Sequence, residues 1–169
     1  IAWTPGCLEI PLVAKKLGID YEKSVTSWEK YLEIGKKVVI PDKRYMGFFW
    51  DAGFLDAIAW AAKAKITDFN NSIFFVNPKT MEVAQYMIDA TRKHRISEYA
   101  NPFDQAGYEK IKADRWLTYP AWFWAQSFAL KDIARLPEPA EGKWRIVRVH
   151  PWKEGDPPTG ADFNCGGLW

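Results

Sequence analysis

The sequence predicts a single α/β domain in which helices and short strands alternate. The chain has 169 residues, enough to bury one proper core. Segments with helical periodicity and short runs rich in β-branched and aromatic residues follow one another without an internal repeat. This mixture is typical of α/β or α+β domains built around one hydrophobic core.

The composition is that of an ordinary globular protein, with 48% hydrophobic and 26% charged residues. A net charge of +2 without a long Lys/Arg run argues against a nucleic-acid partner. The longest apolar runs carry charges and are too short to span a membrane. The chain begins at Ile1 rather than Met, so the lack of a signal peptide indicates nothing about its compartment. Ten tryptophans stand out, and they suit either a tryptophan-rich core or carbohydrate binding.

The first third of the chain predicts an extended start and two helices. Residues 1–6 read as extended and end in a Pro-Gly turn. A weak helix is expected from Leu8 to Leu17, ended by Gly18. A stronger helix covers 25–39, where Thr26 and Glu29 have the spacing of a capping box. Its apolar stripe consists of Trp28, Tyr31, Leu32 and Val39.

The middle of the chain predicts an extended or loop segment over 45–53, then a helix over 54–66 and a buried strand over 72–76. The apolar side of the 54–66 helix contains Leu55, Ile58, Ala59 and Ala62.

The best helical pattern covers 77–96. Asn77 caps it, Pro78 takes the first helical position, and basic residues at 92–95 favour its C-terminal end. The residues expected to be buried are Val83, Ala84, Met87 and Ile88.

The last part of the chain predicts a helix over 105–112, an extended segment over 115–120 and a strand over 144–151 that exposes Arg145 or Arg148. The aromatic run 119–126 is expected to begin a further helix that continues to Ala134, and the final residues read as a loop rich in Gly and Pro.

Common catalytic and metal-binding patterns are missing from the sequence. Neither His94 nor His150 has Cys, His or carboxylate neighbours at metal-ligand spacing. Cys7 lacks a convincing base, and Asp51 and Asp56 read as scattered acids. A phosphate-binding loop and a Gly-x-Ser-x-Gly motif are both lacking. The sequence therefore predicts no enzyme, no metal site and no cofactor.

Several motifs occur in an order that resembles a known family. "GIDYEKSVTSWEKYLEIGKKV" is similar to the start of the second lobe's first long helix in extracellular solute-binding proteins of carbohydrate ABC transporters. "NPKTMEVAQYMIDATRKHRI", "YEKIKADRWLTYPAWFW" and the "GG" of "NCGGLW" follow in the family's order. The resemblance runs from Gly18 onward; the first eighteen residues depart from the family's pattern.

This resemblance implies a single lobe like those of periplasmic binding proteins, with a small mixed sheet flanked by helices. Residues 1–169 would form one lobe of a two-lobe protein, with the other lobe absent from this chain. The implied ligand is a sugar or oligosaccharide, the implied partner is an ABC-transporter permease, and the implied location is periplasmic or extracellular.

The resemblance also implies site residues. Trp122 is the expected stacking residue in the cleft, and Trp50 with Asp51 supplies a second ring and a carboxylate for sugar hydroxyls. Plain core packing is the alternative for each ring and is the favoured expectation for Trp28, Trp60 and Trp144. Trp124 is a further candidate, as are Trp3 and Trp169 at the ends of the chain.

The same resemblance implies a possible disulfide between the two cysteines, because the family's hinge segments run beside each other. A bridge between Cys7 and Cys165 would close nearly the whole chain into a loop. Two unrelated thiols are the alternative.

Two other functions remain open on sequence grounds. An isolated lobe would leave its aromatic cleft face bare, and such a face favours a homodimer. An enzyme built on the same unit would depend on Asp51 or Cys7.

Overall fold

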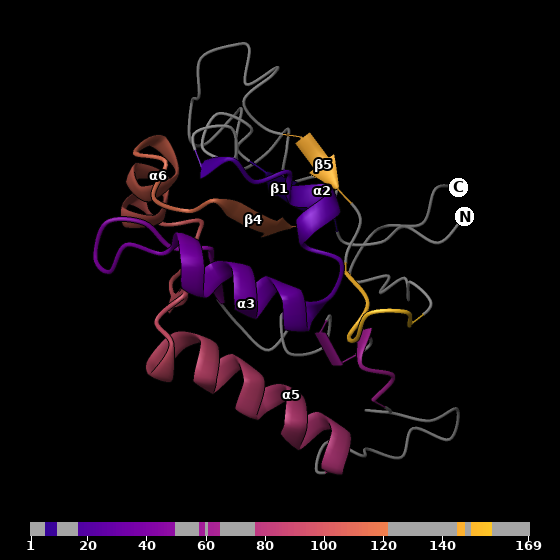
Figure 1. Ribbon diagram of the computed structural model, residues 1–169. Helices are drawn as coiled ribbons and strands as arrows, with labels where there is room; N and C mark the ends of the chain where they lie inside the picture. Colours follow the sequence, from indigo (N-terminus) through magenta and orange to yellow (C-terminus); the bar gives the residue numbers. More distant parts are fainter. Residues whose placement is uncertain are drawn as a thin grey trace, which may run out of the picture.

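The computed structural model describes residues 6–9, 17–49, 58–59, 61–64, 77–121, 145–147 and 150–156. Its elements, arranged as in Figure 1, are β1 (Gly6–Glu9), α2 (Tyr21–Ser24), α3 (Trp28–Val38), β2 (Gly47–Phe49), α5 (Pro78–Ile88), the π-helical turn η1 (Asp89–Lys93), β3 (Ser97–Tyr99), α6 (Gln105–Lys112), β4 (Thr118–Ala121) and β5 (Arg145–Val147).

The strands pair in two groups that are linked through the backbone. β1 lies between β4 and β5 and is antiparallel to both. β2 and β3 pair in parallel. The residues before β2 also run parallel to those before β4, with Tyr45 opposite Trp116. Backbone hydrogen bonds from Leu117 N to Tyr45 O (3.0 Å) and from Thr118 N to Met46 O (2.8 Å) join the two groups.

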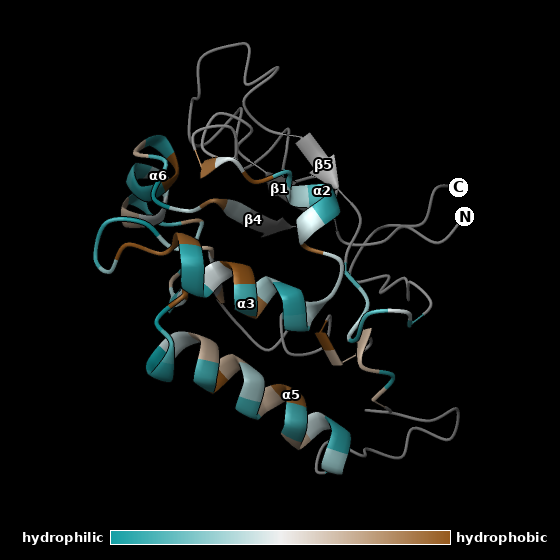
Figure 2. Cartoon of the chain, in the orientation of Figure 1, coloured by the Kyte–Doolittle hydropathy of each residue, from teal (hydrophilic) through white to brown (hydrophobic). Residues whose placement is uncertain are grey.

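Helices α3 and α5 lie next to each other beside the strands (Figure 1). The Tyr86 hydroxyl of α5 donates to the backbone oxygen of Trp28 at 2.7 Å. Hydrophobic and hydrophilic residues alternate around both helices, as expected where one side is buried (Figure 2).

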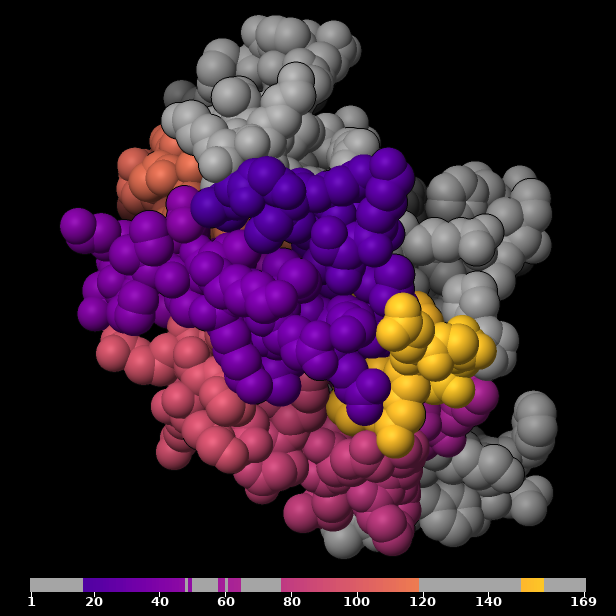
Figure 3. All heavy atoms as spheres, viewed as in Figure 1, coloured from indigo at the N-terminus to yellow at the C-terminus, as the bar shows by residue number. Residues whose placement is uncertain are grey.

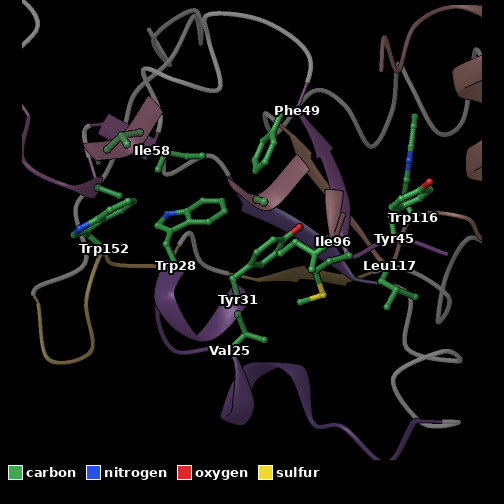
Figure 4. Close-up of a cluster of buried hydrophobic side chains, with 14 of the residues drawn as sticks. Val25, Trp28, Tyr31, Tyr45, Phe49, Ile58, Ile96, Trp116, Leu117 and Trp152 are labelled. Carbon is green, nitrogen blue, oxygen red and sulfur yellow. The ribbon is translucent and has the colours of Figure 1, made fainter. Parts of the chain in front are cut away.

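The core is rich in aromatic residues (Figure 4). Trp28 is buried, as its place in the helical stripe predicts, whereas Trp60 and Trp144 lie outside the described residues. The largest fully buried side chains are Trp116, Tyr31, Phe49, Met46, Ile58, Ile96, Ile111 and Val25.

The expected helix over 8–17 is wrong at its start. Leu8 lies in strand β1, opposite both Tyr119 of β4 and Ile146 of β5. Backbone pairing with two strands more than a hundred residues away overrides a weak local helical pattern. Gly18 does adopt the left-handed conformation expected after a helix, with φ +66°.

The predicted capping box is also wrong by one residue. Ser27, not Thr26, caps α3, and its hydroxyl accepts from the backbone N–H of Lys30 at 3.1 Å. The Thr26 hydroxyl instead donates to Glu154 at 3.2 Å, a contact that local sequence cannot reveal.

Two other helices end differently from the prediction. The helical residues at 58–59 and 61 are followed by a turn well before Ile66, because Lys63 adopts a left-handed φ of 58°. Asn77 caps α5 as expected, through hydrogen bonds from the backbone N–H groups of Lys79 and Thr80. Ile88, expected to be buried, is 49% exposed, whereas Ala90 in the following π-helical turn is fully buried.

The helix at 105–112 and the extended segments at 47–49, 118–120 and 145–147 are confirmed. The helix expected to begin in the aromatic run 119–126 does not begin at its start, because β4 continues to Ala121, which pairs with Gly6 of β1. Helix α2 was not anticipated. The strand expected at 72–76, the helix after residue 121 and the side chains of Arg145 and Arg148 lie outside the described residues.

Candidate functional site: the carboxyl edge of the strands

Strands β2, β3 and β4 run in the same direction and end near one another. Phe49, the last residue of β2, lies opposite Tyr99, the last residue of β3. The parallel bridge between Tyr45 and Trp116 aligns β2 with the chain entering β4. We call this end of the strands, defined by Phe49, Tyr99 and Ala121, the carboxyl edge. Ligands of open α/β sheets typically bind outside such an edge.

The antiparallel strands bring two further chain segments to the carboxyl edge. Gly6, where β1 begins, lies opposite Ala121, where β4 ends. β5 ends at Val147, opposite Cys7. The chain therefore passes this edge where it enters β1 and where it leaves β5.

A buried polar contact fixes β2 beside β4. The Tyr31 hydroxyl lies 3.0 Å from the Thr118 hydroxyl, which in turn donates to the backbone oxygen of Met46 at 2.7 Å. Gly47 lies against both side chains: a Cβ there would come within 2.5 Å of the Tyr31 hydroxyl and 2.8 Å of the Thr118 hydroxyl. The absence of a side chain at Gly47 therefore allows α3 and β4 to approach β2 this closely.

The main candidate residues follow the carboxyl edge directly in the sequence. Trp50 and Asp51 come immediately after Phe49, and Trp122 comes immediately after Ala121. The candidate ligand residues that lie outside the described part of the chain are Trp3, Trp50, Asp51, Trp122, Trp124 and Trp169. Their shared surface therefore stays a prediction.

The possible disulfide stays a prediction as well. The backbone of Cys7 is in β1, next to the carboxyl edge, and Cys165 lies outside the described residues.

Tyr99 is a candidate that the sequence analysis missed. It ends β3 and is 77% exposed, the highest exposure among the large hydrophobic residues that the structure describes. The short segment "SEYANP" carries a usable signal, since alternating residues before an Asn-Pro turn suggest a short strand with an exposed end. Its ring is available at the carboxyl edge for contact with a ligand.

His150 is a core residue. It is 7% exposed, and its Nε2 lies 3.0 Å from the Tyr21 hydroxyl. Burial lowers the pKa of His150 to about 4, so the imidazole is neutral near pH 7. The side chains packed around it include Trp28, whose ring centre lies 6.1 Å away.

Two other kinds of site are absent from the described residues. These residues contain no group of three or more His, Cys, Asp or Glu side chains placed to hold a metal ion. None of the helices in the described ranges has both the length and the apolar character needed to cross a bilayer.

No sequence-family model and no curated protein matches the chain. Solved structures do match in fold. One is an ABC transporter associated binding protein from B. animalis subsp. lactis Bl-04 in complex with beta-1,6-galactobiose, with TM-score 0.72, 20% identity, and coverage of 90% of this chain and 38% of that chain. A second is a solute binding protein from Thermotoga Lettingae TMO bound with alpha-D-tagatose, with TM-score 0.66, 19% identity, and coverage of 91% and 41%.

A third match is UgpB from Mycobacterium tuberculosis in complex with glycerophosphocholine, with TM-score 0.68, 13% identity, and coverage of 92% of this chain and 39% of that chain. The chain thus spans 38–41% of the length of these proteins. At such identities the likeness concerns the fold.

Proposed function

Because the chain has the fold of one lobe of an ABC-transporter solute-binding protein, we propose that it forms one wall of a carbohydrate-binding cleft. The other wall belongs to a second lobe. In this proposal the complete protein works outside the cytoplasmic membrane and delivers its sugar to an ABC-transporter permease. The role of the chain is binding rather than catalysis.

The observation that carries the proposal is the position of Trp50 and Trp122 in the sequence. Each directly follows a strand that ends at the carboxyl edge, where ligands of α/β sheets bind. The Tyr31–Thr118–Met46 contact holds those two strands together. A rigid scaffold of this kind supports precise placement of rings that stack on the apolar faces of a sugar.

In this proposal, aromatic and acidic side chains contact different parts of the sugar. The Trp122 and Trp50 rings cover apolar sugar faces, and the Asp51 carboxylate accepts hydrogen bonds from hydroxyl groups. Trp124, Trp3 and Trp169 are proposed to border the cleft. The aromatic run "YPAWFWAQ" thus continues from a structural strand into the ligand surface.

The test is NMR titration of the chain with a panel of mono- and oligosaccharides, observing the indole N–H signals of the ten tryptophans. We expect one sugar class to shift a small subset of these signals. Trp122→Ala and Trp50→Ala should abolish the shifts, whereas Trp122→Phe should retain part of them because a ring remains. A saturable response that is unchanged in Trp122→Ala and Trp50→Ala would contradict the proposed site.

A further inference from the structure

Basic residues gather where α3 and α5 end. Segment 36–44 contains four cations and one carboxylate, and segment 89–95 contains three cations and one carboxylate. These two segments therefore hold five excess positive charges, while the whole chain has a net charge of +2. We call this surface the basic end; its cations are Lys36, Lys37, Lys43, Arg44, Arg92, Lys93 and Arg95.

The two segments form one continuous surface. Arg95 and Asp42, one from each segment, form an ion pair at 2.8 Å. Burial lowers the pKa of His94 most, and the charges of Lys36 and Lys93 lower it further. His94 therefore lies close to both segments. Figure 3 shows the two segments in contact at the left side of the molecule.

Several cations of the basic end have no ion-pair partner among the described residues: Lys36, Lys37, Lys43 and Arg92, all exposed. Cations in the last turn of a helix commonly offset the helix dipole, which accounts for part of the cluster. Lys43 has no such role, because it lies in the turn after α3 rather than in a helix.

Exposed apolar residues, Ile40 and Pro41, lie in the turn between these cations; we call them the apolar tip. The turn that follows α3 projects from the body of the molecule (Figure 1). Ile40 in this turn is 42% exposed, and its neighbours Pro41 and Lys43 are exposed too. Ile88, at the end of α5, is 49% exposed.

We infer that the basic end is a docking surface for an anionic lipid membrane. Exposed lysines around a small apolar tip match a membrane interface, where lipid phosphates attract the cations and the acyl boundary accepts the apolar side chain. An acidic protein would also satisfy the cations, and it is the alternative that the experiment below tests. The basic segments precede β2 and β3, whereas the carboxyl edge is where these strands end, so docking leaves the proposed ligand site open.

The experiment is co-sedimentation of the 169-residue chain with phosphatidylcholine vesicles and with vesicles in which half the lipid is phosphatidylglycerol, at low and at high salt. We expect binding only to the anionic vesicles and only at low salt. The triple variant Lys36→Gln, Lys37→Gln, Lys43→Gln should bind about 100-fold more weakly, since each lysine near an anionic surface contributes about fivefold. Ile40→Ser alone should weaken binding several-fold.

A matched control removes three lysines elsewhere: Lys23→Gln, Lys63→Gln, Lys153→Gln. It has the same net charge as the test variant and should bind within about threefold of the parent chain. Equal losses in both triple variants would reduce the effect to overall charge and overturn the inference, as would an absence of vesicle binding. Tighter binding to soluble polyglutamate than to anionic vesicles, lost in the first triple variant, would reassign the surface to an acidic protein.

Discussion

The Glu98 side chain contacts several residues that lie apart from it in the sequence. Its carboxylate accepts from the indole N–H of fully buried Trp116 at 2.6 Å and pairs with Lys110 at 3.1 Å. Arg115 lies 3.6 Å from the same carboxylate. A half-buried acid thus joins β3, α6 and the chain entering β4.

Replacing Glu98 should therefore destabilise the chain. Glu98→Ala leaves the buried Trp116 N–H without its acceptor, and we expect a loss of about 2 kcal/mol in the free energy of unfolding. Glu98→Gln keeps an acceptor oxygen and should cost about half as much. Urea denaturation measures both. Glu109→Ala, which removes the exposed ion pair with Lys112, is the control and should cost under about 0.5 kcal/mol. Equal stabilities for Glu98→Ala and the parent would show that the contact is not important.

The pH dependence of stability should report on His150. Its pKa falls from the ordinary 6.5 to about 4 on folding because the ring is buried. Between these values the unfolded chain binds more protons than the folded chain. The contribution of His150 is therefore complete above pH 6.5 and is lost as the pH falls towards 4, by up to about 3 kcal/mol.

His150→Phe separates this effect from other titrations. The variant keeps an aromatic ring beside Trp28 but cannot be protonated, so its stability should fall less steeply between pH 6.5 and 4. His94→Gln is the comparison, since His94 is only partly buried and should leave most of the slope in place. If His150→Phe shows the same slope as the parent, His150 is not the titrating group.

At the scale of the elements, the close packing of β2 against α3 and β4 depends on Gly47. Gly47→Ala would push a Cβ against the Tyr31 and Thr118 hydroxyls, and we expect a cost of about 1–3 kcal/mol from this overpacking. Tyr31→Phe removes the nearer hydroxyl. In that background Gly47→Ala should cost clearly less, and a double-mutant cycle by chemical denaturation measures the difference. Costs that simply add would disprove the contact.

Local sequence predicts those elements whose ends are determined locally. Asn77 accepts from its own helix's first N–H groups, and Asp104 caps α6 through the N–H of Gly107, so helices begin where the pattern predicts. β1 could not be predicted, because its strand form depends on pairing with β4 and β5. The exposure of Ile88 follows from α-helical geometry: Ile88 comes five residues after buried Val83 and lies on another side of the helix, whereas buried Ala90 comes seven residues after Val83, about two turns on.

The candidate site was predictable only in part. The family-like motif predicts Trp122 and the ring–carboxylate pair with Asp51 predicts Trp50, and the structure adds that both tryptophans follow strands ending at one edge. Tyr99 was missed because a three-residue strand gives too short a pattern for periodicity to detect.

At the scale of the whole molecule, one wall of a cleft should bind sugar weakly. The chain spans about two fifths of the proteins whose fold it shares, and under the proposed function the hydrogen bonds of a second lobe do not contribute to binding by this chain alone. We expect affinity for the chain alone that is millimolar or too weak for calorimetry to detect, against roughly micromolar, about −8 kcal/mol, for a two-lobe protein. Calorimetric titration of both forms checks this, and micromolar binding by the chain alone would refute it.

The segment 150–156 completes the core from far along the sequence. The Pro151 backbone oxygen accepts from Trp28 N, the Tyr21 hydroxyl lies against His150 across 129 positions, and Trp152 packs on Tyr86 with ring centres 5.3 Å apart. During synthesis on the ribosome, the aromatic side of α3 and α5 therefore stays uncovered until segment 150–156 has emerged. Folding of this core must wait for that segment, and the growing chain is vulnerable to aggregation and chaperone capture during the wait.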